Sequence, residues 1–77
     1  MYQIWEYQDA LGVTRRGISA GFSDFGGTDI TYRFWRLDED DKIIRFDSGG
    51  VMLDSVNGPR LKAARRVGAI RPEDAKA

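Results

Sequence analysis

The chain has 77 residues, 42% of them apolar, and its twelve basic and twelve acidic residues leave no net charge. A chain of this length has room for one small core, and the balanced charge excludes a general attraction to nucleic acid or to an anionic membrane. The absence of cysteine excludes disulfides and thiolate metal sites and favours a cytoplasmic protein. No apolar run is long enough to predict a membrane span.

Three strands are predicted in the first half of the chain. Residues 2–7 are rich in aromatic side chains, which favour strands. Residues 13–22 form the second expected strand, and Gly17 and Gly21 within it predict a bulge or a bend. Residues 30–37 alternate between apolar and polar side chains, the pattern of a strand with one buried face.

Two further strands are expected after an acidic turn. Residues 38–41 are all acidic, and four like charges favour a solvated turn. Residues 42–47 and 51–56 are predicted to pair as a hairpin around Ser48-Gly49-Gly50.

One short helix is expected near the C-terminus, over about residues 58–67. Pro59 suits the first helical position, and Gly68 suits the residue that ends a helix. We expect a single domain over residues 1–70 and a frayed tail over residues 71–77.

The predicted fold class is a β-rich α+β domain, in which a five-stranded antiparallel meander is curled into a small SH3-like or partly open barrel and followed by one short C-terminal helix. A flat meander leaves two open edges, and glycine kinks favour closure. A curled sheet with the helix laid across it is the alternative.

The register of the third strand decides which of its residues are buried. A slip of one residue in this strand would bury Trp35 and Leu37 instead of its even-numbered residues. The expected core comprises Ile4, Ile18, Ala20, Phe22, Tyr32, Phe34, Ile44, Phe46, Val51, Leu53, Leu61 and Val67.

An enzyme is not expected. Histidine and cysteine, the usual proton-transfer group and the most reactive nucleophile, are absent. A core this small also leaves little room for a pocket of about 300 Å³ or more. The glycine-rich segments 25–28 and 48–50 lack the lysine of a phosphate loop, and residues 38–41 lack the ligand spacing of a calcium loop. We therefore expect no catalytic residue, metal or cofactor.

The first candidate surface is the outward face of the predicted sheet. Strand alternation sends Ile43 outward together with five candidate protein-binding residues, which are Trp5, Tyr7, Arg33, Trp35 and Arg45. Small residues of the second strand lie between them, so the face would form a shallow groove with aromatic walls. Such a groove suits an extended peptide, a partner loop or stacked bases. Alternatively, the two tryptophans only cover the backbone at the glycines.

The second candidate surface is the basic helix. Residues 57–72 contain five basic residues and no acidic one, so this part of the neutral chain is locally cationic. Its alternative role is that of a solvated helix face. The candidate nucleic-acid-binding residues are Arg15, Arg16, Arg60, Lys62, Arg65 and Arg66.

Together these patterns predict a small non-enzymatic protein-binding module with a larger protein partner. One such module would be an inhibitor or accessory factor encoded by a phage or mobile element and acting on a nucleic-acid-handling protein, as an anti-CRISPR-type inhibitor does. The alternative function is nucleic-acid binding, either directly or through that partner. A homodimer formed through the aromatic face is a third reading, and no membrane partner is expected.

Overall fold

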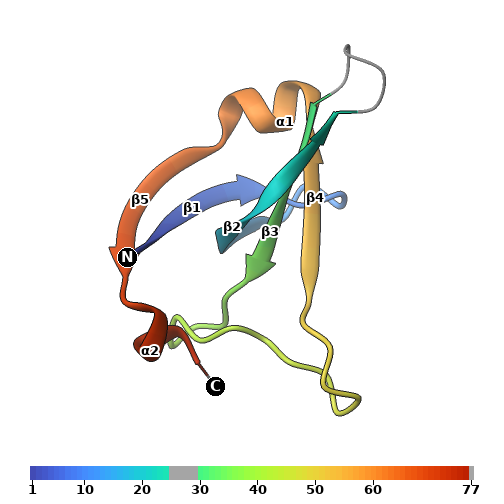
Figure 1. Cartoon of the computed structure of the whole chain (residues 1–77). Helices are drawn as coiled ribbons and strands as arrows, with labels where there is room; N and C mark the ends of the chain where they lie inside the picture. The colour runs from blue at the N-terminus through green and yellow to red at the C-terminus, as the bar shows by residue number, and fades with distance from the viewer. Residues whose placement is uncertain (25–29, 77) are drawn as a thin grey trace.

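The computed structural model of the chain describes residues 1–24 and 30–76. Five strands and two short helices follow one another (Figure 1) as β1 (Tyr2–Gln8), β2 (Thr14–Asp24), β3 (Ile30–Arg36), β4 (Leu53–Asn57), α1 (Gly58–Ala63), β5 (Arg65–Ile70) and α2 (Pro72–Ala75). The glycine-rich segment 25–28 and the side chain of Phe22 lie outside the described part of the chain. No helix within the described ranges is long and apolar enough to cross a membrane.

The strands form one antiparallel sheet in the order β4-β3-β2-β1-β5. A five-stranded antiparallel sheet with a short helix was predicted, and this is confirmed. The predicted meander is wrong, because β5 pairs with β1 and not with β4, the strand that precedes it. The sheet is strongly curled but open, because β4 and β5 form its two edges and do not pair with each other (Figure 1). The predicted closure into a barrel is therefore wrong.

The segment between β3 and β4 forms a turn and two isolated bridges in place of the expected strand over residues 42–47. The bridges join Leu37 to Ile43 and Arg45 to Val51. The acidic turn is confirmed: the carboxylate of Asp38 accepts the backbone N–H groups of Asp40 and Lys42 at 2.9 and 3.0 Å. These bonds satisfy two backbone N–H groups within the tight turn, a role that aspartate side chains commonly have.

The helix predicted over residues 58–67 ends early, and its second half is a strand. α1 stops at Ala63, and Ala64 is already extended, with φ −66° and ψ 141°. The following residues pair with β1 over the whole length of β5. A six-residue helix has little stability of its own, so the backbone pairing with β1 overrides the helical periodicity of the sequence.

The C-terminal residues expected to fray form α2 instead. The side chain of Ala75 is completely buried, and the carbonyl of Ala75 accepts the backbone N–H of Ile43 at 2.8 Å. Lys42 donates from Nζ to the carbonyl of Asp74 at 2.7 Å. These long-range contacts anchor the tail.

Apolar side chains are buried on both faces of the sheet, in two separate clusters. The α2 core consists of Ile4, Ile18, Leu37, Ile43 and Ala75. The α1 core consists of Tyr7, Phe34 and Val56, with Trp5, Tyr32, Leu61 and Ala64 packed against it. The central strands are apolar on both faces. α1 covers one face, whereas Leu37, Ile43 and Ala75 of α2 pack against the other.

Several expectations about single core residues are wrong for this reason. Phe46, Leu53 and Val67 were expected inside but are 50%, 46% and 41% exposed, respectively. Conversely, Tyr7 and Ile43 were expected outside but are 2% and 5% exposed. Only one face of the sheet was expected to be buried, whereas apolar side chains are buried on both faces. The burial of Ile4, Ile18 and Phe34 is confirmed.

Candidate functional site

Trp5 and Trp35, the two residues at the centre of the predicted binding face, lie on opposite faces of the sheet. Trp5 is opposite Gly17 in the β1–β2 pair, whereas Trp35 is opposite Ile18 in the β2–β3 pair. Directly opposed residues share a face and successive residues alternate. The two tryptophans therefore do not form the common groove that the sequence predicted.

Ring contacts confirm this separation. The ring of Trp5 lies 6.4 Å from that of Phe34 in the α1 core. The ring of Trp35 makes an edge-to-face contact with Tyr2 at 6.3 Å, beside the α2 core.

The remaining candidates of that face are also dispersed. Tyr7 is buried in the α1 core, so it is not available to a partner. Arg33 and Arg45 are exposed, the first on β3 and the second in the segment before β4.

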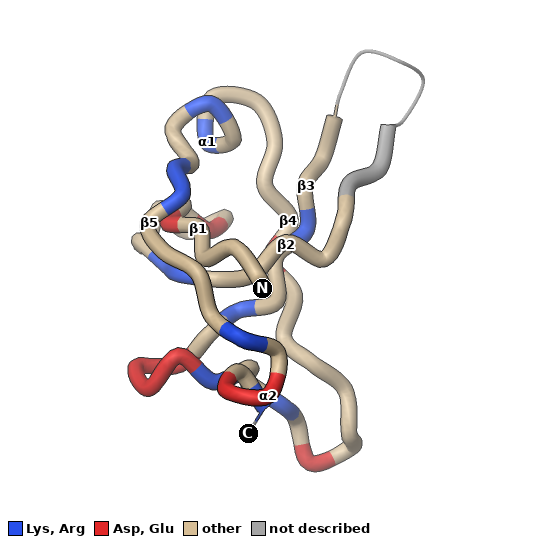
Figure 2. Tube along the Cα trace, turned by 60° about the vertical axis from the view of Figure 1, so that its left-hand side comes forward, with Lys and Arg blue, Asp and Glu red and all other residues tan. Residues whose placement is uncertain are grey.

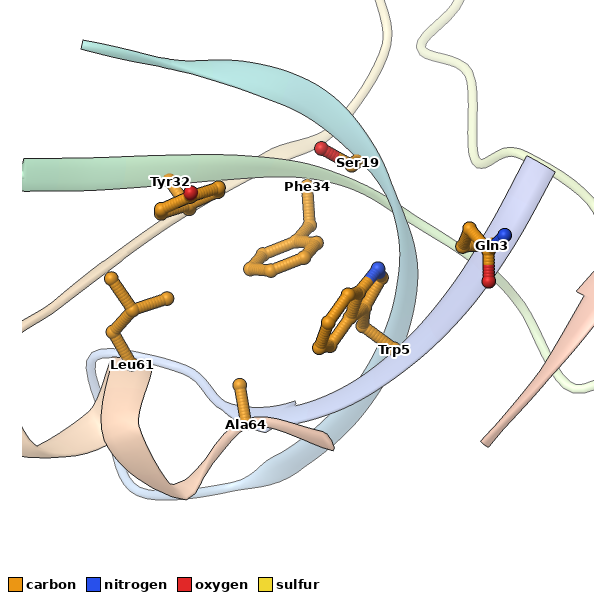
Figure 3. Close-up of a pocket in the computed structure, with 7 residues that line it drawn as sticks. All are labelled: Gln3, Trp5, Ser19, Tyr32, Phe34, Leu61 and Ala64. Carbon is orange, nitrogen blue, oxygen red and sulfur yellow. The ribbon is translucent and has the colours of Figure 1, made fainter. Parts of the chain in front are cut away.

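The structure instead contains a pocket of about 440 Å³ between α1 and the sheet. We call it the α1 pocket, and Figure 3 shows its lining, which consists of Gln3, Trp5, Ser19, Tyr32, Phe34, Leu61 and Ala64. A pocket of this size was not expected in so short a chain. It forms because α1 is short and crosses the sheet without burying any of its own residues fully.

The lining of the α1 pocket is mainly aromatic and aliphatic. The rings of Trp5, Tyr32 and Phe34 come from two strands and face Leu61 and Ala64 across the same space (Figure 3). None of the described lining residues carries a carboxylate, a guanidinium or an amine. The pocket can therefore hold an apolar group.

A polar network supports one side of this pocket. Arg36 donates from Nε and Nη2 to the two carboxylate oxygens of Asp54 at 2.9 and 2.6 Å. Tyr7 donates its phenol proton to the same carboxylate at 2.6 Å, and its ring stacks on Phe34 with 4.4 Å between centroids. The hydrogen bond to Asp54 holds Tyr7 in place, and the ring of Tyr7 in turn packs against the ring of Phe34.

The network continues into the turn after β1. Asp9 accepts a hydrogen bond from Nε of Arg15 at 2.9 Å and two backbone N–H groups, those of Leu11 and Val13. Nη2 of Arg36 lies 3.6 Å from the same carboxylate. Asp9 therefore connects the turn to the Arg36–Asp54 pair.

These contacts shift the pKa values of the network. The hydrogen bond from Arg15 is the main reason that the pKa of Asp9 is lowered. Burial alone would raise the pKa of Asp54, but the hydrogen bonds from Arg36 and Tyr7 outweigh it and lower the pKa. Burial, followed by the bond to Asp54, raises the pKa of Tyr7. All three groups thus stay in one protonation state at neutral pH, as expected of a structural network.

Sequence reasoning missed Arg36 and Asp54. Neither residue stands out, because isolated arginines and aspartates are common on exposed strand faces. Their pairing depends on the register between β3 and β4, in which Phe34 is opposite Asp54.

The four basic candidates that were expected on one helix lie on two elements, and three of all six basic candidates form salt bridges. Arg65 and Arg66 belong to β5, whereas Arg60 and Lys62 belong to α1 (Figure 2). The salt bridges are Arg15 with Asp9, Arg16 with Asp41 and Arg65 with Glu6. Arg60 donates to the carbonyl of Gln8 at 3.4 Å, and Arg66 donates to Oε1 of Gln3 at 3.0 Å.

Comparison of the chain with models of known protein families, with curated proteins and with solved structures found no match.

Proposed function

We propose that this chain is a small, non-enzymatic, cytoplasmic protein-binding module, and that the α1 pocket receives an apolar side chain of a larger protein partner. The observation that carries the proposal is the pocket itself: its volume is about 440 Å³, and its described lining consists of three aromatic rings, two aliphatic side chains and the uncharged polar residues Gln3 and Ser19. Large apolar anchors that enter such pockets dominate the affinity of many protein interfaces.

The surroundings of the pocket favour a side chain attached to a chain over a free small molecule. A second, more open hollow lies beside β5 and is lined by Gln3, Arg66, Val67, Gly68 and Ala69. Gln3 lines both spaces, so they adjoin each other. An anchor in the α1 pocket therefore has room for its backbone to continue along β5.

The wider proposal is an inhibitor or accessory factor, encoded by a phage or mobile element, that acts on a nucleic-acid-handling protein. A small domain with an apolar pocket can act by occupying a partner's surface, which supports an inhibitor or adaptor. The finer description of the fold as SH3-like belongs to the same proposal, and the strong curl of the sheet supports it (Figure 1).

The first test needs no partner. N-acetyl-tryptophanamide, an uncharged mimic of an aromatic side chain, is titrated into the chain while backbone and methyl NMR signals are recorded. We expect saturable shifts at Leu61, Ala64 and Trp5. Shifts that do not saturate, or that centre on the Trp35 side of the sheet, would contradict the proposed site.

The second test uses a partner captured from nuclease-treated lysate. Leu61→Glu places a charge in the α1 pocket, and Ala63→Glu is its matched control, since Ala63 is an exposed residue of the same helix that is not among the described lining residues of the pocket. We expect Leu61→Glu to raise the dissociation constant by about tenfold or more, equivalent to about 1.4 kcal/mol. Equal effects of the two variants would argue against an apolar anchor.

Nucleic-acid binding remains the alternative proposal, supported by the four basic residues on α1 and the start of β5 (Figure 2). The salt bridges of Arg15, Arg16 and Arg65 within the chain argue against this alternative, because these three cations are already paired with carboxylates. Binding of labelled duplex DNA should then fall with salt, with a log–log slope of about −0.9 per neutralised phosphate. Binding that does not change with salt would exclude this alternative.

A further inference from the structure

The side chain of Arg66 lies at the rim of the α1 pocket. In the β1–β5 pair Arg66 is opposite Trp5, and directly opposed residues share a face of the sheet. Nη1 of Arg66 donates to Oε1 of Gln3 at 3.0 Å, and both Gln3 and Trp5 line the pocket. A guanidinium is therefore held beside one end of an otherwise uncharged pocket.

The polar groups at this end of the α1 pocket are mainly unused hydrogen-bond donors. Among the side chains that the structure describes, the indole N–H of Trp5 and the hydroxyl of Ser19 have no hydrogen-bond partner. Because Oε1 of Gln3 accepts the bond from Arg66, the amide NH₂ group of Gln3 is left for a ligand. Figure 3 shows the indole nitrogen of Trp5 at the edge of the ring turned toward Gln3 and away from Leu61. A ligand at this end therefore meets mainly donors.

The positive charge at this end is not neutralised by the described part of the chain. Arg66 forms no salt bridge with any described residue. Glu6, which follows Trp5 in β1, is paired with Arg65 at 2.9 Å. The carboxylate of Asp54, on the same face of the sheet, is held in the polar network. These carboxylates are thus committed, whereas the guanidinium at the rim is not.

We propose that the partner residue that enters the α1 pocket is an apolar residue next to an aspartate or glutamate, whose carboxylate binds Arg66. The inference rests on the proposed function, because it specifies the segment that the pocket receives. A carboxylate only accepts hydrogen bonds, so it matches both the positive charge and the unused donors. Bonds between a guanidinium and a carboxylate are among the stronger hydrogen bonds in proteins.

The space around Arg66 favours an acidic side chain within a segment over the carboxylate at the end of a chain. The more open hollow beside β5 is lined by Arg66 and continues along the strand to Ala69. The partner chain therefore has room on the far side of Arg66. A charge on the partner that complements this rim selects the partner more than it adds affinity.

Short peptides test the inference on the full chain. N-acetyl-Trp-Asp-amide and N-acetyl-Asp-Trp-amide carry a carboxylate after or before the same aromatic anchor, and the two corresponding asparagine peptides are the uncharged controls of equal shape. NMR titration gives the four dissociation constants. We expect at least one aspartate peptide to bind about fivefold more tightly than its asparagine counterpart at low salt. This preference should shrink as salt is added.

Two variants test whether Arg66 causes the preference. Arg66→Gln removes the charge, and Arg45→Gln is the matched control, because Arg45 is an exposed arginine that is not among the described lining residues of either space. The ratio of the asparagine to the aspartate dissociation constant should fall to about one in Arg66→Gln and stay at about five in Arg45→Gln. Circular dichroism checks that both variants are folded.

The outcomes separate this inference from the proposed function. If N-acetyl-tryptophanamide does not bind in the α1 pocket, the proposed function fails and this inference fails with it. If the amide binds but neither aspartate peptide binds better than its asparagine counterpart, or if the preference persists in Arg66→Gln, only the inference is wrong.

N-acetyl-tryptophan tests the other source of a carboxylate, the C-terminus of a partner. We expect the aspartate peptide to gain more over its asparagine counterpart than N-acetyl-tryptophan gains over its amide. A gain confined to N-acetyl-tryptophan would place the end of a partner chain at Arg66 and overturn the inference.

Discussion

The phenol of Tyr7 in β1 donates a 2.6 Å hydrogen bond to Asp54 in β4, although the residues are 47 positions apart and two strands lie between them in the sheet. The bond spans the curled face beneath α1. Arg36 in β3 holds the same carboxylate with two further bonds. One carboxylate therefore links three strands.

Tyr7→Phe should destabilise the fold without changing its shape. The variant keeps the ring stacked on Phe34 but removes one hydrogen bond to a buried carboxylate, and such a loss costs about 1–3 kcal/mol. Urea denaturation would measure the free energy of unfolding. Tyr2→Phe is the control, because the hydroxyl of Tyr2 takes no part in this network, and it should change the free energy by less than about 0.5 kcal/mol. Equal losses would show that the Tyr7–Asp54 bond contributes little.

The same tyrosine predicts a loss of stability at high pH. Burial raises the pKa of Tyr7 in the folded chain, whereas in the unfolded chain the pKa is about 10. The stabilisation is therefore complete below pH 10 and declines as the pH rises above it, because only the unfolded chain then releases the proton. Tyr7→Phe should show a smaller decline in unfolding free energy between pH 9 and 11 than the wild type does.

At low pH the carboxylates of the network dominate. The pKa values of Asp9 and Asp54 are lowered in the folded chain, so their stabilisation is complete above the unfolded value of about 3.9 and is lost as the pH falls through the folded values. The free energy of unfolding should decrease below about pH 4. Asp54→Asn should lower stability at pH 7 but show a shallower acid decline. An unchanged acid slope in this variant would contradict the assignment.

Gly17→Ala should destabilise the chain strongly for a steric reason. A Cβ at this position would lie 2.7 Å from the carbonyl oxygen of Trp35 and 2.8 Å from the phenol oxygen of Tyr7. The backbone contact cannot be relieved by a rotamer change, and overpacking of this kind typically costs about 1–3 kcal/mol. Gly50→Ala is the matched control, since its nearest neighbour would be 3.8 Å away. Thermal unfolding of both variants would test the difference.

Removal of residues 72–77 tests the role of α2. The truncated chain loses the buried side chain of Ala75 and the backbone bond from Ile43, so we expect a loss of about 1–3 kcal/mol. Removal of residues 76–77 alone should have little effect. A truncated chain as stable as the full chain would support the frayed tail that the sequence predicted.

Local sequence signals were sufficient for the first three strands and for the turn at residues 38–41. Their evidence lies within a few positions: alternating side chains, clustered aromatics and a run of four acidic residues. They were also sufficient to exclude histidine and cysteine chemistry. The same reasoning failed at Arg65 and Arg66, where a helical spacing occurs in residues that form β5.

The sequence by itself therefore determined a small, strand-rich, antiparallel domain with aromatic side chains available for burial. Only the tertiary structure decided that both faces of the sheet are covered, that Trp5 and Trp35 point apart, and that the α1 pocket exists. These features depend on the register between strands and on which segment covers each face. Both are set by contacts between residues far apart in sequence, such as Tyr7 with Asp54 and Ile43 with Ala75, which leave no local pattern to read.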